Sequence, residues 1–284
     1  MKFIHLTDTH VIAEGRTLYG ANPARRLRLA VESINREHGD AAFVVVTGDL
    51  THWGDAEAYE AFSRAITDLQ MPVVLMVGNH DDTPAFTARF PQAMRDENGF
   101  VQGARQTEEG LCLFLDTRVQ GFHYGGYCPA RLAWLQAQLE GSTGPVFLFM
   151  HHHPFEIGCG HMDDIRMLDH EAFRAVIQPH KDRIRHLFFG HAHRPIFGNW
   201  DGISFSCMRG LNHQLGLFLR PENGVVPGNL AEPAYGVVLV QDRNVIVHMH
   251  EFALRAPAFD LAPPPGVDSA TWALEMKHPG FTDY

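Results

Sequence analysis

Short apolar runs alternate along the chain, up to about Gly190, with segments in which apolar residues recur at helical spacing. The runs are rich in Val, Phe, Leu and Ile, as expected of strands that are buried on both faces. Strands that alternate with helices in this way indicate an α/β protein. The predicted strands cover residues 4–6, 42–46, 73–77, 111–115, 146–150 and 187–189.

The segments between these strands carry the apolar stripes of amphipathic helices. The first helix has the clearest beginning, because Asn22 suits the N-cap and Pro23 suits the first helical position. We interpret all the stripes as helix faces that pack into the core. They consist of Leu27, Val31 and Ile34; Tyr59, Phe62, Ile66 and Leu69; Leu132, Leu135 and Leu139; and Phe173 with Ile177.

The pattern becomes mostly β after Gly190. Apolar runs are interrupted here by residues typical of turns rather than by helical stripes. The predicted elements are strands at 203–205 and 215–219, a loop rich in Pro, Gly and Asn at 221–233, and a hairpin of residues 235–240 and 245–250 that turns at 242–244.

The tail from Pro257 onward, which includes Pro263-Pro264-Pro265-Gly266, has no clear periodicity. We expect it to lie along the surface or against a partner subunit. The sequence therefore predicts a catalytic core in residues 1–220, followed by residues 221–284, whose hairpin and tail complete the core or mediate homo-oligomerisation. The 284 residues, 45% of them hydrophobic, suffice for one large core of this kind.

Charge and cysteine content narrow the function classes. The formal net charge of −10 disfavours a protein that follows the phosphate backbone of long nucleic acids, because a basic face supplies most of the affinity there. We find neither a signal-peptide pattern nor an apolar stretch long enough for a bilayer. The four cysteines lack metal-clip spacing, so we expect reduced thiols in a cytoplasmic protein with no membrane partner.

Five short polar motifs follow predicted strands, in one order along the chain. A single Asp-x-His or Gly-Asp pair occurs in many proteins, so no motif identifies a site alone. Their joint placement predicts that all five meet where the strands of one sheet end. The motifs are Asp8-Thr9-His10, Gly48-Asp49, Gly78-Asn79-His80-Asp81, His151-His152 and Gly190-His191-Ala192-His193.

The side chains in these motifs are typical ligands of divalent metals. Asp8 and His10 are two residues apart, so on a strand they point the same way and can hold one ion. The lone carboxylate of Asp49 can bridge two ions, because each of its oxygens can take one. The amide of Asn79 binds an ion without adding charge, which keeps the ions electrophilic.

His191 and His193 are also two residues apart, and each can serve a different ion. Two ions that share a water lower its pKa, orient the phosphoryl group and neutralise charge on the leaving oxygen. Phosphate ester cleavage needs these effects, because an anionic group repels an anionic nucleophile. The residues therefore favour a two-metal phosphoesterase and imply no organic cofactor.

The ordered set Asp-x-His, Gly-Asp, Gly-Asn-His-Asp, His-His-x-Pro and Gly-His-x-His resembles the calcineurin-like binuclear metallophosphoesterases, from Met1 to about Pro195. Within that superfamily the chain is most similar to bacterial class III cyclic-nucleotide phosphodiesterases and their glycerophosphodiesterase relatives. The resemblance implies an α/β fold, a four-layer α/β/β/α sandwich of two mostly mixed β-sheets, with a β-rich C-terminal extension. It also implies two divalent ions, for which the donor atoms suit Mn, Fe, Zn and Co alike.

The same resemblance implies roles for individual residues. His80, which follows a predicted ligand, would contact the phosphate or donate a proton in catalysis. One metal would be held by Asp8, His10 and His193, and the other by Asn79, His151 and His191, with Asp49 as the bridge between them.

Further histidines are candidates for substrate contact. His213 and His161 lie in segments similar to those that reach the phosphate or cap the pocket in glycerophosphodiesterases. His152 is a candidate substrate contact, although a residue beside a ligand more often orients it. His153 stands where relatives usually have proline, and it either contacts substrate or faces solvent. We expect surface or satisfied interior positions for His5, His38, His123, His170, His180, His186, His248, His250 and His278.

Departures from other branches of the superfamily narrow the function. Gly48-Asp49 continues as Leu50-Thr51-His52 rather than as the Asp-Arg-Gly of protein phosphatases, and His52 stands where purple acid phosphatases have a metal-binding Tyr. We therefore expect hydrolysis of a small soluble phosphodiester: 3′,5′-cyclic AMP, another cyclic nucleotide or a glycerophosphodiester. The alternatives are a phosphomonoesterase with the same centre and a non-catalytic scaffold that binds partner proteins.

Overall fold

The chain divides into two compact units, Met1–Ala253 and Leu254–Tyr284. The first unit contains both large β-sheets. No helix among the described residues is both long and apolar enough to cross a membrane. The predicted packing of the tail, and part of the predicted loop at 221–233, lie outside the described residues. The computed structural model describes residues 1–219, 226–253, 262–263 and 265–275.

The second unit contains helix α7 (Ser269–Glu275), which the sequence pattern does not predict. Its cap is Asp268, whose Oδ1 accepts the backbone N–H groups of Ala270 and Thr271, each at 3.0 Å. A helix of 7 residues is too short to show an apolar stripe in the sequence. The hydrogen bonds to Asp268 instead fix where the helix begins.

The first sheet has five strands in the order β13-β12-β1-β2-β3. β1 (Lys2–Leu6), β2 (Val44–Thr47) and β3 (Val73–Met76) are parallel, as expected of buried strands joined by helices. β12 (Tyr235–Gln241) pairs antiparallel with β1 and with β13 (Asn244–His250). The predicted hairpin is therefore confirmed, and it lies in the same sheet as the first strand of the chain.

The second sheet has six strands in the order β4-β5-β6-β7-β9-β8. Its inner strands are the predicted apolar runs. The two edge strands, β4 and β8, escape prediction because they are partly exposed and polar residues interrupt their pattern. The strands are β4 (Gly103–Thr107), β5 (Gly110–Phe114), β6 (Val146–Phe149), β7 (Ile184–Phe189), β8 (Ile196–Trp200) and β9 (Ile203–Cys207).

The predicted strand at 215–219 is wrong beyond its first residue. Only β10 (Gln214–Leu215) is extended, and it pairs with β11 (Gly228–Asn229) in a small ribbon. Leu217 and Leu219 are each 60% exposed. The apolar run therefore marks a surface segment and not a buried strand.

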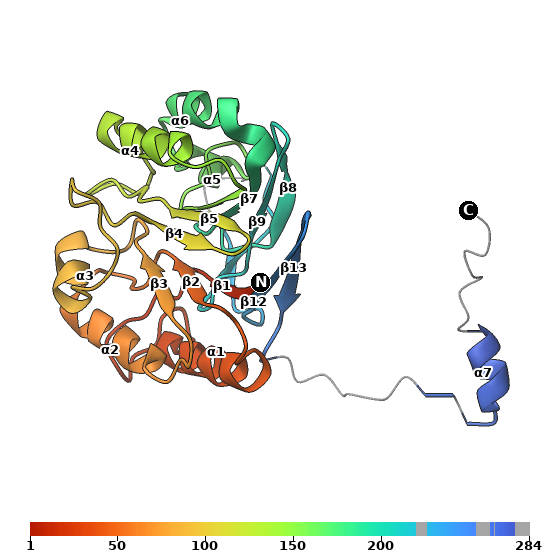
Figure 1. Cartoon of the computed structure of the whole chain (residues 1–284). Coiled ribbons are helices and arrows are strands. Elements are labelled where there is room, and N and C mark those ends of the chain that lie inside the picture. Colours follow the sequence, from red (N-terminus) through yellow and green to blue (C-terminus); the bar gives the residue numbers. More distant parts are fainter. Residues whose placement is uncertain (220–225, 254–261, 264, 276–284) are drawn as a thin grey trace. The chain divides into compact units, whose positions relative to one another are not determined.

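Three apolar clusters organise Met1–Ala253 into four layers, as Figure 1 shows. Phe3, Phe147 and Phe188 belong to the cluster between the sheets. The other clusters join the first sheet to α1, α2 and α3 and the second sheet to α4 and α6, which confirms the expected sandwich. The helices are α1 (Pro23–Glu37), α2 (Ala56–Ile66), α3 (Thr83–Arg89), α4 (Pro129–Glu140), α5 (Gly160–Asp164) and α6 (His170–Ile177).

The five motifs belong to both sheets, so the expectation that they follow strands of one sheet is wrong. Those of Asp8, Asp49 and Asn79 follow β1, β2 and β3, whereas those of His151 and His191 follow β6 and β7. The backbone N–H of His191 donates to Oδ1 of Asp8 at 3.1 Å. The carboxyl ends of the parallel strands of both sheets therefore meet, which is where α/β folds place their ligands.

Candidate metal centre

The predicted ligands lie in sharply turned backbone at the strand ends. Asp8, His10, Asp49, His191 and His193 have φ angles of 52°, 45°, 51°, 66° and 49°, in the left-handed region that side chains seldom adopt. The strand pleat, from which the sequence argument orients Asp8 and His10, ends before them. The turns themselves direct these side chains, and such strain is typical of functional sites.

Two glycines make room for the ligands. A Cβ on Gly78 would lie 2.2 Å from Oδ1 of Asp49 and 2.7 Å from Nε2 of His151. A Cβ on Gly190 would lie 2.0 Å from Oγ1 of Thr7. All three distances are far inside van der Waals contact, so any side chain would displace its neighbours. Glycine at these motif positions is therefore required by the close approach of the ligand loops.

One group of converging atoms comes from Asp8, His10, Asp49 and His193, all within 4.8 Å of one another. Nε2 of His10 lies 3.0 Å from Nε2 of His193 and 3.4 Å from Oδ2 of Asp49. Nε2 of His193 lies 3.4 Å from Oδ1 of Asp8. Atoms bound to one ion at about 2.1 Å and near-tetrahedral or right angles lie about 3.0–3.4 Å apart. This spacing fits a single divalent ion.

A second group lies around His151. Its Nε2 is 3.4 Å from Oδ2 of Asp49 and 3.1 Å from Oδ1 of Asn79. The ring of His191 lies 5.1 Å from the ring of His151. Nε2 of His191 is buried and has no hydrogen-bond partner among the residues that the structure describes. A buried nitrogen without a partner is costly, and a cation bound to this ring would offset that cost.

A single oxygen of Asp49 belongs to both groups. Oδ2 faces His10 and His151, whereas Oδ1 accepts the backbone N–H of His80 at 2.9 Å. Oδ2 is therefore the oxygen that both groups share, and the expectation that each oxygen takes one ion stays a prediction. Burial alone would raise the pKa of this carboxyl, but the neighbouring rings of His151 and His80 hold the pKa well below its usual range.

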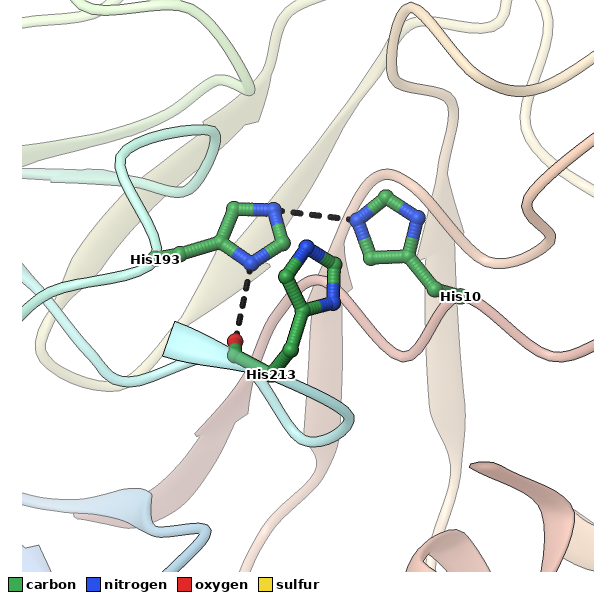
Figure 2. A group of neighbouring side chains, drawn as sticks. All are labelled: His10, His193 and His213. Atoms are coloured by element: carbon green, nitrogen blue, oxygen red, sulfur yellow. Dashed lines mark hydrogen bonds between the residues drawn. The ribbon is translucent and has the colours of Figure 1, made fainter. Parts of the chain in front are cut away.

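Hydrogen bonds at the far ring nitrogens orient two of the ligands. Nδ1 of His151 donates to the carbonyl of Thr47 at 2.7 Å. Nδ1 of His193 donates to the carbonyl of His213 at 2.9 Å, as Figure 2 shows. A neutral imidazole carries only one N–H group, so Nε2 of each ring keeps its lone pair for an ion.

The charge state of the rings also fits a cation. Burial lowers the pKa of His10 and of His191 well below its usual range, so both rings are neutral donors of a lone pair. Burial would lower the pKa of His151 as well, but Asp49 raises it to about 9. An ion that binds beside His151 and Asp49 would displace the proton from Nε2 of His151 and use the lone pair that this frees.

His80 presents one ring nitrogen to this centre. Its Nδ1 donates to the carbonyl of His52 at 2.9 Å, which leaves Nε2 for a substrate. Nδ1 of His52 in turn lies 3.0 Å from Nδ1 of His10. Burial and the neighbouring His80 lower the pKa of His52 to about 4. A neutral His52 can accept the Nδ1 proton of His10, which turns Nε2 of His10 toward the ion.

A cavity of about 330 Å³ opens over the two ligand groups. His123 is exposed, as expected, but it also lines this cavity, where its Nδ1 lies 2.9 Å from Nδ2 of Asn79. His52 follows Asp49 by three residues, and that proximity was the only local signal for it. Residues of the cavity wall to which the sequence argument assigns no role are Tyr19, His52, His123, Met162, Ile165, Leu215 and Val226.

Two of the predicted substrate contacts, His213 and His161, line the cavity. The ring of His213 lies 4.3 Å from that of His193 and 5.0 Å from that of His10, and Figure 2 shows it beside both. Burial and the nearby His193 lower the pKa of His213 to about 2, so its ring is neutral. His161 lies on α5 and is exposed to solvent.

Two other predicted positions do not reach the cavity. His152 is completely buried, with Nδ1 bonded to Oγ1 of Thr117 at 2.8 Å and Nε2 to the carbonyl of His123 at 3.2 Å. Both nitrogens are engaged, so direct substrate contact is ruled out by geometry and the ring supports the loop of His123. His153 is also completely buried, with its ring 5.7 Å from that of Phe189, so neither substrate contact nor solvent exposure is correct.

Asp81, the last residue of its motif, joins two ligand loops. Its Oδ2 accepts the N–H of Gly78 at 2.9 Å and of Leu50 at 3.1 Å. Its Oδ1 accepts the hydroxyl of Tyr59 at 3.0 Å. Burial and the nearby charge of Asp49 raise the pKa of Asp81 to about 6. These bonds hold the loop after β2 against the loop after β3.

Comparisons with known proteins identify the family and the fold. The calcineurin-like phosphoesterase family matches residues 1–195. A probable cyclic nucleotide phosphodiesterase of Rhodopseudomonas palustris is 44% identical over 92% of this chain and 96% of its own. A probable glycerophosphodiester phosphodiesterase of Arcobacter nitrofigilis is 28% identical over 78% of this chain and 82% of its own. A purple acid phosphatase from yellow lupin seeds shares the fold, with a TM-score of 0.63 and 13% identity over 92% of this chain and 52% of its own.

Proposed function

The chain belongs to the calcineurin-like phosphoesterase family, and we propose that it hydrolyses small phosphodiesters, 3′,5′-cyclic nucleotides above all, at a two-metal centre. The observation that carries the proposal is the position of Asp49 Oδ2, 3.4 Å from a ligand nitrogen of His10 and 3.4 Å from one of His151. One oxygen between two ligand groups is the arrangement of a bridged binuclear site. Because a fold alone does not define an activity, the site carries the argument.

The ligand set leaves the centre electropositive. When bound, two divalent ions supply Lewis acidity toward phosphoryl oxygens and lower the pKa of water. The chain contributes only two carboxylates to them, so a positive charge remains to attract an anionic diester. The donor atoms suit Mn, Fe, Co and Zn. We assign Asp8, His10 and His193 to one ion, Asn79, His151 and His191 to the other, and Asp49 to both.

His80 is the residue that we assign to proton transfer or phosphate binding. Its Nδ1 is held by the carbonyl of His52, so Nε2 meets the substrate. When the ring carries a second proton, Nε2–H can donate to a phosphoryl oxygen or transfer that proton to the leaving alkoxide. The neutral ring of His213 lies on the cavity wall beside His193 and orients the bound phosphate by hydrogen bonding. A cytoplasmic location and oligomerisation through the C-terminal residues stay predictions.

The cavity walls favour a nucleotide over a glycerophosphodiester. Tyr19 lines the cavity with a 63% exposed side chain, and its ring lies 4.8 Å from that of His213. An adjoining cavity of about 340 Å³ shares Tyr19 and His213 and continues to Leu230. An aromatic face contributes about 1–3 kcal/mol per stacked base, which glycerol cannot gain. The relative that is 44% identical is named as a probable cyclic nucleotide phosphodiesterase.

Two alternatives use the same fold. A phosphomonoesterase would use the same ligands, and the centre by itself does not discriminate between monoesters and diesters. A non-catalytic scaffold needs neither converging ligands nor an oriented His80. The donor hydrogen bonds at His151, His193 and His80 therefore support catalysis.

The experiment is metal loading followed by a turnover screen. The purified full-length chain is depleted of metal, reloaded with Mn, Fe, Co or Zn, and assayed on cyclic AMP, a glycerophosphodiester and a nucleoside monophosphate. We expect metal-dependent turnover with the highest kcat/KM for cyclic AMP. Faster turnover of the monoester would favour the monoesterase. Absence of turnover with every metal and substrate would favour the scaffold.

Substitution of Tyr19 tests the substrate class separately. Tyr19→Ala should raise KM for cyclic AMP about tenfold, as expected from the loss of a stacked base, and leave KM for a glycerophosphodiester nearly unchanged. Tyr19→Phe keeps the ring and is the matched control. An equal effect of Tyr19→Ala on both substrates would contradict stacking.

A further inference from the structure

A second cluster of potential ligands lies outside the catalytic cavity, where α1 ends beside the last residue of β13. Glu37 is the final residue of α1, His38 is its C-cap, and His250 ends β13. One ligand atom from each of the three lies within 4.8 Å of the other two. We propose that these side chains form a third metal site, which binds a zinc-like divalent ion and clamps α1 to β13.

The distances resemble those of the catalytic ligands. Oε2 of Glu37 lies 3.0 Å from Nε2 of His250. Oε1 of Glu37 is engaged by the hydroxyl of Ser33 at 3.1 Å and by the guanidinium of Arg36. Oε2 is therefore the oxygen that faces His250, within the spacing of about 3.0–3.4 Å between atoms that share one ion. The ligand atom of His38 lies within 4.8 Å of both.

A cation satisfies this cluster better than a proton does. Nε2 of His250 lies 3.0 Å from Oε2 of Glu37 but makes no hydrogen bond with any described residue. Nε2 of His38 is shielded from solvent and has no hydrogen-bond partner among the described residues, so it remains unsatisfied. One ion can accept the lone pairs of both imidazoles and of the carboxylate at once.

The surroundings are also favourable for a cation. The site lies at the carboxyl end of a helix of 15 residues, where the unpaired carbonyls carry partial negative charge. Lys2, whose charge adds to burial in lowering the pKa of His38, is paired with Asp40, and Arg36 is paired with Glu37. The side chains of His250 and Glu37 are 34% and 32% exposed, so an ion can enter and water can complete its coordination.

The donor set indicates the class of ion. Two imidazoles and one carboxylate with an open position suit Zn²⁺, Co²⁺ or Ni²⁺ better than Mg²⁺ or Ca²⁺, which prefer oxygen. α1 packs on the first sheet and β13 is an edge strand of that sheet. An ion bound to both would tie the edge strand to the helix layer, so its effect is on stability rather than on the reaction.

The test measures the number of zinc ions bound to each full-length chain. Parent, His38→Ala and His250→Ala proteins are dialysed against the same buffered free Zn²⁺ concentration and analysed by plasma mass spectrometry. We expect each variant to bind about one zinc fewer per chain than the parent, and to melt about 5 °C lower in zinc buffer. His248→Ala, an exposed histidine on the same strand, is the matched control and should bind as much zinc as the parent.

The outcome does not depend on the catalytic centre. His250→Ala should keep the phosphodiesterase activity of the parent, because none of these residues lies in the cavity. If an alanine variant fails to fold, Glu37→Gln keeps the shape and should still lower the zinc content by about one per chain. Equal zinc content of parent and variants would overturn the third site. If the variants bind one zinc fewer than the parent but the parent has no diesterase activity, only the proposed function would be overturned.

Discussion

Two sets of buried histidines in this protein have opposite surroundings. His5 and His186 lie at strand positions beneath the site, and Nε2 of each is bonded to a hydroxyl of a neighbouring strand at 2.9 Å. At the strand ends, Nε2 atoms of His10 and His193 instead face each other at 3.0 Å, beside the carboxylate of Asp49. The Nε2 atoms of the first pair have partners within the protein, although Nδ1 of His5 has none among the described residues, whereas the Nε2 atoms of the second pair would be satisfied by a cation.

Burial and neutrality therefore do not identify a ligand. Burial lowers the pKa of His5 and His186 to about 3, and it lowers the pKa of His10 well below its usual range too. What differs is the convergence of several lone pairs on one carboxylate oxygen. Substitutions at the strand ends should thus act on metal binding and turnover, and those at the interior pair should act on stability alone.

The largest effect is expected from Asp49→Asn, because an amide cannot bridge two cations with one anionic oxygen. Activity should fall by more than the roughly 10²–10⁴-fold that the loss of a general acid costs. Metal content and kcat/KM for cyclic AMP are the measurements. Turnover within a few-fold of the parent would contradict the binuclear assignment and with it the contrast between the two histidine sets.

His80→Ala should keep both metals and slow turnover by about a hundredfold or more, since Nε2 acts on the substrate rather than on an ion. If His80 is the acid, an activated aryl diester should lose much less rate than an alkyl diester, because its leaving group needs no proton. An equal loss for both would assign His80 to phosphate binding. Loss of a metal would place it among the ligands.

His52→Ala tests a residue that orients a ligand without binding the ion itself. Without His52 the ring of His10 loses the partner of its Nδ1, and activity or metal affinity should fall by about 10–100-fold. Binding isotherms for the metals and steady-state rates measure the loss. His52→Asn, which restores a short hydrogen-bonding group, is the control and should recover part of it. An unchanged metal affinity in His52→Ala would show that His10 needs no such support.

Asn79→Ala should have a smaller effect, confined to one ion. It removes a neutral ligand from the group around His151, so that ion should bind about tenfold more weakly while the other is unaffected. Calorimetric titration of the metal-free protein should resolve one shifted site. Two unchanged sites would mean that Asn79 is not a ligand.

No effect on activity is expected from substitutions of the interior pair, His5 and His186. The pKa of His5 and His186 is about 3 in the folded chain and 6.5 in the unfolded chain, so the unfolded state binds more protons at low pH. The stability is complete above pH 6.5 and declines as the pH falls toward about 3, by about 1.4 kcal/mol per unit for each histidine.

His186→Gln keeps a donor for Ser206 and removes one titrating ring. The free energy of unfolding in urea, measured between pH 7 and pH 4.5 with chelator present, should therefore fall less steeply in this variant than in the parent. Cyclic AMP turnover at pH 8 should be the same in both. Equal slopes would show that His186 does not titrate as an interior histidine.

Local sequence determined the inner strands and the candidate ligands. A strand such as Val146–Phe149 is apolar throughout because helices cover one face and a second sheet covers the other. The motif that follows lies in the turn after the strand, so a ligand such as His151 is placed by a few neighbouring residues. Edge strands such as Gly103–Thr107 lack this signal because they are partly exposed.

Only the tertiary structure decided which distant residues meet. His123 reaches Asn79 across 44 positions, and His250 reaches Glu37 from the opposite end of the first unit. His153 differs from its neighbour His151 only in the direction in which the turn after β6 sends its side chain. Such contacts depend on the pairing of strands far apart in sequence and on the meeting of two sheets. No short pattern encodes them, because the free energy that selects them comes from packing the whole chain.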